Sequence, residues 1–289
     1  MWLVLLGAAL ADDAPHAVWE TGSRHVPVLG ELELDFSPVD LLYPLQVADP
    51  YRSDMRFVAI QSFGESIDGA GALRWGTRIG GRYGFFRFHP ADDPDVGAQI
   101  DVEVGFLAQF DLENQLDNIG WDGVYSFQLS WKLANGLAGR LGTDHDSSHI
   151  GDEFGGAEHR INYTREEYLL SLSWEPDERF WFYGEGGYAY HMGCPTLQLP
   201  WRAQYGAVLE GRQRMLGNRV GLYAAADASH FEEDQWTLNY TIQSGLRYPV
   251  PELGRSYRVG LEYYDGRAPI GEFFQVRERY LAAGLWFDL

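Results

Sequence analysis

A short stretch near the middle of the chain contains the side-chain types of a serine hydrolase. His145 and Ser147 are separated by one residue, and Asn162 follows after a segment rich in glycine and acidic residues. An imidazole can take the proton of a nearby hydroxyl and make it a nucleophile, while a third polar group orients the imidazole. These three residues therefore predict a Ser-His-Asn catalytic site, if the fold brings them together.

Two β-strands joined by a hairpin loop are the elements that would position these side chains. In residues 137–147 the odd-numbered positions share one face because side chains alternate along a strand, so His145 and Ser147 point the same way. In residues 162–174 the even-numbered positions form the apolar face, and counting back in twos places Asn162 and Glu166 on it. The pairing register decides whether the side chains meet, and the sequence leaves that register open.

The chain after residue 52 is a series of strand-length segments separated by turn signals. Compact turns such as A-N-G and E-P-D-E alternate with longer and more acidic connections. Short turns at one end and longer loops at the other are typical of outer-membrane β-barrels, whose tilted strands need ~9–11 residues to cross the bilayer. We expect about twelve strands, beginning near Met55, Leu73, Gln99, Trp121, Leu137, Arg160, Phe180, Trp201, Arg219, Trp236, Tyr257 and Arg277.

The two faces of these segments also favour a membrane barrel. Ile100, Val102 and Val104 oppose acidic residues, and aromatic residues stand at both ends of the apolar faces, as in the interfacial girdles of membrane barrels. The last residues alternate to the C-terminus, which resembles the signal by which the barrel-assembly machinery recognises its substrates. We therefore predict an all-β fold, a transmembrane antiparallel outer-membrane β-barrel in residues 53–289, with a soluble all-β domain as the alternative.

The composition and the N-terminal segment limit the classes of protein to which the chain can belong. A formal net charge of −20 excludes nucleic acid as a partner, because phosphate binding needs a basic surface. Residues 1–11 predict a secretory signal peptide, and residues 12–52 predict a periplasmic N-terminal extension beside or under the barrel. Outside the leader no run of ~20 apolar residues occurs, which excludes a transmembrane helix. The single cysteine, Cys194, cannot form an internal disulfide.

Two family resemblances arise from these segments. The motifs A-D-P at 48–50, H-D-S-S-H-I-G-D-E-F at 145–154 and R-I-N-Y-T-R-E-E-Y at 160–168 resemble DUF1207, an uncharacterised bacterial envelope family. His145 and Ser147 also resemble the H-x-S motif of outer-membrane phospholipase A, and Asn162 lies in a segment similar to that family's return strand. This second resemblance implies a twelve-stranded barrel with a Ser-His-Asn site facing lipid. The sequence departs from it at Ser148, where the family has asparagine, and in a longer loop before Asn162.

The resemblances leave the third catalytic residue and the reaction open. Outer-membrane lipopolysaccharide deacylases also use H-x-S, with a glutamate as third member, so Glu158 or Glu166 is an alternative to Asn162. The function expected is that of a serine esterase acting on phospholipid or lipopolysaccharide in the bacterial outer membrane. The alternative is a non-enzymatic barrel, either a narrow channel (porin) or an envelope-structural protein. Whether the protein forms a homodimer is also open.

Two further groups of polar residues admit more than one interpretation. The hairpin loop could bind Ca²⁺ through carboxylates, or Zn²⁺ or Ni²⁺ with histidine, or it could be a solvated acidic loop; we expect no required cofactor, with Ca²⁺ as the alternative. Its candidate ligands are Asp144, His145, Asp146, His149, Asp152, Glu153 and His159. The inward-facing strand positions carry both signs of charge, which predicts either a packed network of ion pairs or a small-solute pore. These positions are Asp101, Glu103, Lys132, Arg140, Glu185, Arg202, Glu210, Arg212, Asp227, Arg247, Arg258 and Glu262.

Overall fold

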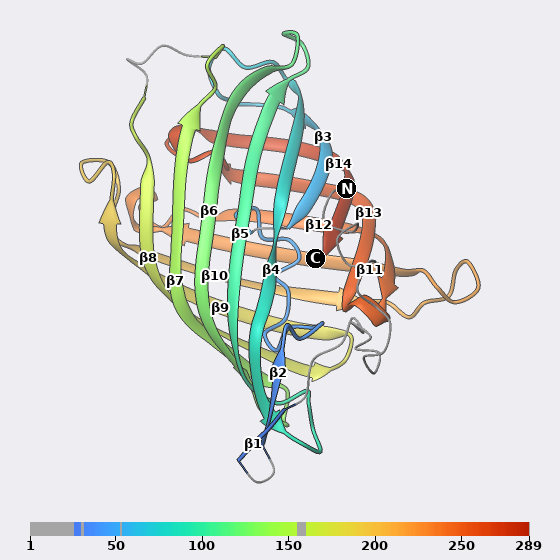
Figure 1. Ribbon diagram of the computed structural model, residues 1–289. Coiled ribbons are helices and arrows are strands. Elements are labelled where there is room, and N and C mark those ends of the chain that lie inside the picture. Colours follow the sequence, from blue (N-terminus) through green and yellow to red (C-terminus); the bar gives the residue numbers. More distant parts are fainter. Residues whose placement is uncertain (1–25, 30–31, 53, 155–159, 289) are drawn as a thin grey trace, which may run out of the picture.

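The computed structural model describes residues 26–29, 32–52, 54–154 and 160–288. In this part of the chain, twelve antiparallel strands close into a barrel, with the last strand paired to the first (Figure 1). They are β3 (Met55–Ser62), β4 (Leu73–Pro90), β5 (Gly97–Asp111), β6 (Asp117–Lys132), β7 (Leu137–Ile150), β8 (Thr164–Asp177), β9 (Phe180–Met192), β10 (Trp201–Glu210), β11 (Gly221–Phe231), β12 (Asn239–Val250), β13 (Arg255–Arg267) and β14 (Arg277–Asp288). The predicted all-β, twelve-stranded barrel is confirmed.

The remaining described elements are short. The strands β1 (Val26–Leu29) and β2 (Leu32–Phe36) form a hairpin, and β2 pairs with the end of β4. Single turns of 3₁₀-helix are η2 (Glu232–Asp234), η3 (Pro251–Leu253) and η4 (Gly271–Phe273). None of the helices in the described ranges is long and apolar enough to cross a membrane. The predicted signal peptide, residues 1–11, lies outside the described residues.

The period-two patterns of the sequence place the barrel strands well. Half of the predicted strand starts coincide with the observed ones, and the largest differences, at β6 and β8, are four residues. At β8 the difference has a local cause. Asn162, the predicted second-strand residue, has a φ of 57°, which is left-handed rather than extended backbone. The strand therefore begins only at Thr164.

The barrel wall has an apolar outer face and a polar inner face. Outward-facing Leu170 and Leu222 are 51% and 63% exposed, whereas the inward-facing Arg140 and Thr241 are fully buried. This is the reverse of a soluble β-sandwich, in which the apolar faces are packed together. A wall of this kind suits a hydrocarbon environment, and the pairing of β14 with β3 closes it.

The connections differ between the two ends of the barrel. At one end, called here the loop end, the strands are joined by residues 63–72, 112–116, 151–163, 193–200, 232–238 and 268–276. At the other end, called here the turn end, the connections include the two-residue turn between β8 and β9 and the η3 turn between β12 and β13. Longer connections at one end and mostly compact turns at the other are the pattern expected from the sequence.

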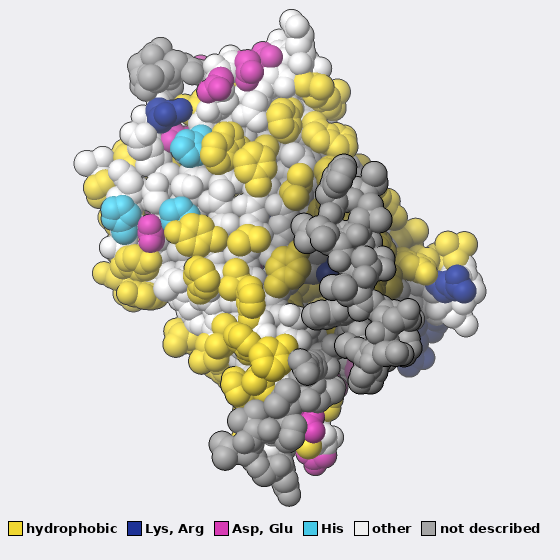
Figure 2. Space-filling view, in the orientation of Figure 1, with side chains coloured by type: hydrophobic (Ala, Val, Ile, Leu, Met, Phe, Trp, Pro, Cys, Tyr) yellow, Lys and Arg dark blue, Asp and Glu magenta, His cyan; other side chains and the backbone are white. Residues whose placement is uncertain are grey.

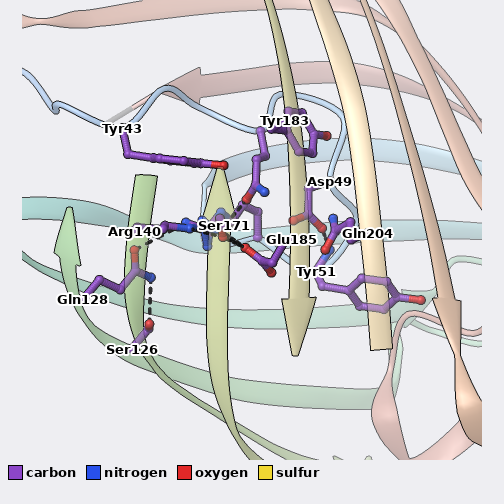
Figure 3. A network of polar contacts seen from close by, with 12 residues as sticks. Tyr43, Asp49, Tyr51, Ser126, Gln128, Arg140, Ser171, Tyr183, Glu185 and Gln204 are labelled. Carbon is purple, nitrogen blue, oxygen red and sulfur yellow. Dashed lines mark hydrogen bonds and ion pairs between the residues drawn. The ribbon is translucent and has the colours of Figure 1, made fainter. Parts of the chain in front are cut away.

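Residues 40–52, called here the lumen segment, run through the inside of the barrel. The sequence led us to expect the N-terminal extension beside or under the barrel, whereas these residues of it lie inside the barrel. Tyr43 is fully buried, and the centre of its ring is 5.6 Å from the guanidinium group of Arg82 and 4.7 Å from that of Arg140. Figure 3 shows Tyr43 and Arg140 in the polar network of the lumen. Arg140 also donates a 2.7 Å hydrogen bond to Gln46, and the Trp181 indole donates one of 2.9 Å to the carbonyl of Leu45.

Arginine side chains of β4 hold the lumen segment against the barrel wall. Arg78 and Arg82 donate hydrogen bonds to the carbonyls of Pro50 and Tyr43, and Arg87 donates one of 2.6 Å to the carbonyl of Asp40. An irregular segment inside a barrel has carbonyls without ladder partners, and buried carbonyls need such donors. The arginines therefore supply donors to three carbonyls of the segment inside the lumen.

Ion pairs of strand residues complete the interior. Glu185 accepts hydrogen bonds from Arg140 and Arg202, and Arg56 lies 3.2 Å from Glu262. The two partners in each of these pairs come from adjacent strands or from strands separated by one other, so they tie neighbouring parts of the wall together. Of the two interpretations of the inward charges, the packed ion-pair network is the one observed.

Candidate active site

The alternation along β7 places His145 and Ser147 on the outer, lipid-facing side of the barrel. Their neighbours Asp144 and Asp146 point the other way and line an internal cavity of about 60 Å³ beside the lumen segment. Figure 2 shows hydrophobic side chains over the visible outer face, with the visible histidines toward the end at which β7 enters its loop. The shared outward face expected for His145 and Ser147 is therefore observed, at the loop end.

The register of the hairpin brings a carboxylate against His145. In the pairing of β7 with β8, His145 is directly opposite Glu166 and Ser147 is opposite Thr164. The Nδ1 atom of His145 lies 3.3 Å from Oε1 of Glu166, and the two side chains are 18% and 30% exposed. The two atoms are at ion-pair distance, and an imidazole whose Nδ1 faces a carboxylate keeps its Nε2 atom for proton exchange, as in a catalytic histidine beside its orienting carboxylate.

Aromatic residues hold both members of this pair. The imidazole of His145 stacks on the ring of Tyr125 in β6, with centroids 4.3 Å apart and an angle of 16° between the planes. The hydroxyl of Tyr190 in β9 donates a 2.9 Å hydrogen bond to Oε2 of Glu166, and its ring packs on Tyr168. A carboxylate on a lipid-facing wall is costly without partners, and here both oxygens face a polar group.

Ser147 lies beside an open part of the outer wall. Its hydroxyl donates a weak 3.4 Å hydrogen bond to the carbonyl of Gly123 in β6, and Gly123 has no side chain to cover it. A Cβ atom at Gly123 would meet Ser147 Oγ and the Trp121 ring only at 3.8 Å. The stacked pairs Tyr125–His145 on one side and Trp121–His149, at 4.2 Å, on the other flank this space, called here the Gly123 hollow. The missing side chain leaves space for at least a methyl-sized group next to the serine.

Asn162 lies apart from this arrangement. It precedes β8, is exposed, and adopts the left-handed conformation that asparagine tolerates better than most residues. The structure thus places His145 beside Glu166, with Ser147 two residues along the same outward row, and leaves Asn162 beyond the strand end. The alternation already placed Glu166 on the correct face, but only the register shows that it is opposite His145. The other alternative, Glu158, lies outside the described residues.

The residues considered as a metal site are divided between the two faces of the wall. Asp144 and Asp146 face the lumen, whereas His145 and His149 face outward and stack on aromatic rings. Asp152 and Glu153 are exposed in the loop, and His159 lies outside the described residues. Within the described ranges, no group of three or more histidine, cysteine, aspartate or glutamate residues is placed to hold a metal ion.

The closed antiparallel sheet, its apolar outer wall and its loop-end connections define an outer-membrane type of β-barrel protein. Within this class the chain matches the family described as "Protein of unknown function (DUF1207)" over residues 22–289, and it belongs to that family. No protein of curated function matches the sequence.

Solved structures resemble the barrel at low sequence identity. Outer membrane phospholipase A from Escherichia coli has a TM-score of 0.55 and 12% identity, over 82% of this chain and 94% of that chain. The Salmonella typhi outer membrane phospholipase dimer with bound calcium has a TM-score of 0.55 and 12% identity, over 86% of this chain and 95% of that chain. The NanC porin has a lower TM-score of 0.45 at 12% identity, over 81% of this chain and 100% of that chain. At such identity the likeness to the phospholipases is one of fold.

Proposed function

We propose that the protein is an acyl-ester hydrolase of the bacterial outer membrane, with Ser147 as nucleophile, His145 as general base and Glu166 as the residue that orients His145. The observation that carries the proposal is the 3.3 Å approach of His145 Nδ1 to Glu166 Oε1 on the lipid-facing wall, in the same outward row as Ser147. Glu166 takes the role that the sequence first suggested for Asn162.

The chemistry would proceed in two steps. His145 takes the proton of the Ser147 hydroxyl as Oγ attacks the ester carbonyl, and the protonated imidazole then gives that proton to the leaving alcohol. The acyl group remains on Oγ until water, deprotonated by His145, releases it as a carboxylic acid. The carboxylate of Glu166 stabilises the imidazolium in both steps and keeps its ring in one orientation.

The location of the site favours a lipid substrate. A serine on the outer wall at the rim of the apolar belt meets the ester groups of membrane lipids, which lie between the headgroups and the acyl chains. The Gly123 hollow gives such an ester access to Ser147 Oγ. Phospholipid and lipopolysaccharide both carry acyl esters, and the similarity in fold to outer membrane phospholipases supports phospholipid as the first substrate to test.

Calcium, dimer formation and assembly are separate parts of the proposal. The Salmonella typhi phospholipase is a dimer with bound calcium, so homodimer formation and a Ca²⁺ requirement are proposed as further possibilities, and the assay below varies Ca²⁺. The described residues of one chain include no group of three ligands that could hold a metal, so no step above uses one. As an outer-membrane barrel, the protein would be inserted by the barrel-assembly machinery.

The test is ester hydrolysis by the detergent-refolded full chain on phospholipid and on lipopolysaccharide, with and without Ca²⁺. We expect Ser147→Ala and His145→Ala each to remove activity. The matched controls are Ser244→Ala, an exposed serine on the outer wall of β12, and His230→Ala, on β11 near the loop end. Both controls should keep wild-type activity. Hydrolysis that survives in Ser147→Ala, or no hydrolysis of any acyl ester by the wild type, contradicts the proposal.

The second candidate function, a narrow channel, is less well supported because the lumen segment fills the barrel. Arg140, whose guanidinium contacts both Tyr43 and Gln46, has no exposed surface, and the cavity beside the segment is only about 60 Å³. We expect the full chain to show no single-channel conductance in planar bilayers. Steady conductance by the wild type would favour the channel.

A further inference from the structure

A second group of charged residues lies on the outer wall at the loop end. Asp265 of β13 is paired directly with Arg279 of β14, and Arg277 opens the same strand. Arg277 and Arg279 share the outward row of β14 with Leu281 and Leu285, which are 51% and 47% exposed. Cationic side chains therefore replace apolar ones where this row reaches the rim of the barrel.

The carboxylate of Asp265 holds both guanidinium groups in place. Its Oδ1 lies 2.7 Å from Nη2 of Arg277, and its Oδ2 accepts a 2.9 Å hydrogen bond from Nε of Arg279. The Asp265 side chain is only 8% exposed, but those of Arg277 and Arg279 are 39% and 49% exposed. The acid is thus covered by its two partners, and the cations face outward.

The cluster, called here the arginine clamp, keeps exposed hydrogen-bond donors. Two guanidinium groups share the carboxylate of Asp265. Among the described residues Arg279 donates through Nε alone, and its side chain is 49% exposed, so its terminal nitrogens are accessible to a ligand. Arg277 also donates a 3.3 Å hydrogen bond to the carbonyl of Leu238. The acids of η2, Glu233 and Asp234, lie 2.9 and 3.6 Å from the inward-facing Arg267, and Asp234 also attracts Arg277.

The surroundings of the clamp match the headgroup level of a membrane. Tyr240 is paired directly with Asp265, and the Tyr240 and Tyr263 rings lie 5.7 Å apart on the outer wall. Tyrosines of this kind mark the interface between headgroups and hydrocarbon. A charged group is costly on the lipid-facing side at the midplane but nearly free at the interface, where it can meet the phosphates of lipids.

We propose that Arg277 and Arg279 form a binding site for the phosphate group of an anionic lipid in the leaflet at the loop end. The planar guanidinium fork matches phosphate oxygens, and a pair already oriented by Asp265 loses little side-chain freedom on binding. The apolar row of Leu281 and Leu285 lies directly below the clamp and would contact the acyl chains. Free inorganic phosphate offers the same oxygens without these chains, so a lipid is the occupant proposed.

The experiment measures lipid retention by the purified full chain in detergent, using native mass spectrometry. The probes are ether-linked phosphatidylglycerol, which has no ester to hydrolyse, ether-linked phosphatidylcholine, and inorganic phosphate as competitor. The proposal does not rest on the hydrolase, and ether lipids keep the two results separate. The variants are Arg279→Gln, the neutral triple variant Asp265→Asn with Arg277→Gln and Arg279→Gln, and Arg255→Gln as control. Arg255 is exposed at the turn end of β13.

We expect the wild type to bind phosphatidylglycerol more tightly than phosphatidylcholine. The triple variant removes the carboxylate together with its partners, and it should lower the affinity for phosphatidylglycerol about tenfold. Arg279→Gln alone should lower this affinity about threefold to fivefold, because each arginine near an anionic headgroup contributes a few-fold to binding. Arg255→Gln should change the affinity for phosphatidylglycerol less than twofold. Equal binding by wild type and triple variant overturns the proposal. Displacement of the lipid by millimolar inorganic phosphate would overturn its lipid part and identify a site for free anions.

Discussion

Two polar clusters interrupt the outer wall of this barrel at its loop end, and they differ in chemistry. His145 and Glu166 lie on β7 and β8, and the arginine clamp lies on β13 and β14. Four strands separate the two clusters in each direction around the barrel, so they are on opposite sides. Each consists of a carboxylate bound to cationic or titratable partners from the neighbouring strand.

The two clusters differ in the groups that remain free to react with or bind a ligand. Glu166 orients one imidazole whose other nitrogen is free for proton transfer, and Ser147 and the Gly123 hollow are adjacent. Asp265 orients two guanidinium groups that cannot give up a proton at physiological pH, and the described outward rows of β13 and β14 contain no serine, threonine or cysteine. The first cluster therefore suits catalysis, and the second suits binding of an anion.

The largest expected effect separates the two clusters by activity. Ser147→Ala should lower kcat on phospholipid by about 10³-fold or more, since the nucleophile is removed. The neutral triple variant of the arginine clamp should keep kcat within about twofold, because it touches no reacting group. The measurement is steady-state ester hydrolysis in mixed micelles, with heat-modifiable gel mobility as the check of folding. An equal loss in both variants would mean that the clusters are not separate.

The next effect identifies the third catalytic residue. Glu166→Gln keeps the shape of the side chain but removes the charge that stabilises the imidazolium, so kcat should fall about 10²-fold or more. Asn162→Ala should change kcat less than about threefold, because the exposed Asn162 lies beyond the end of β8. Comparison of the two kcat values decides the assignment. If Asn162→Ala has the larger effect, Glu166 is not the orienting residue.

A smaller effect tests the Gly123 hollow. Gly123→Leu places a side chain beside Ser147 and should lower kcat/KM about tenfold by displacing the ester group. Gly186→Leu is the matched control, since Gly186 also faces outward and a Cβ atom there meets nothing within 4 Å. This control should leave kcat/KM unchanged. Similar losses in both variants would point to a general effect of leucine on the wall.

The smallest effect concerns the support of Glu166. Tyr190→Phe removes the 2.9 Å hydrogen bond to Oε2 but keeps the ring against Tyr168. At this exposed site the hydrogen bond should contribute about 1–1.4 kcal/mol, so kcat should fall roughly fivefold to tenfold. Tyr188→Phe, on the outer wall of the same strand, is the control. A kcat for Tyr190→Phe equal to that of the wild type would show that His145 alone holds Glu166.

The sequence by itself determined the barrel and the direction of its side chains. Alternation is a property of the extended backbone, so it located the strands and placed His145, Ser147 and Glu166 on one face before any pairing was known.

Only the tertiary structure decided which side chains meet. The register that pairs His145 with Glu166, and the pairing that puts two arginines on Asp265, depend on the fit of whole strands rather than on any local pattern. The lumen segment is the extreme case, because Tyr43 approaches the carbonyl of Leu172, 129 residues away in the sequence. Contacts of that range follow from closure of the barrel around the segment, and no period along the chain encodes them.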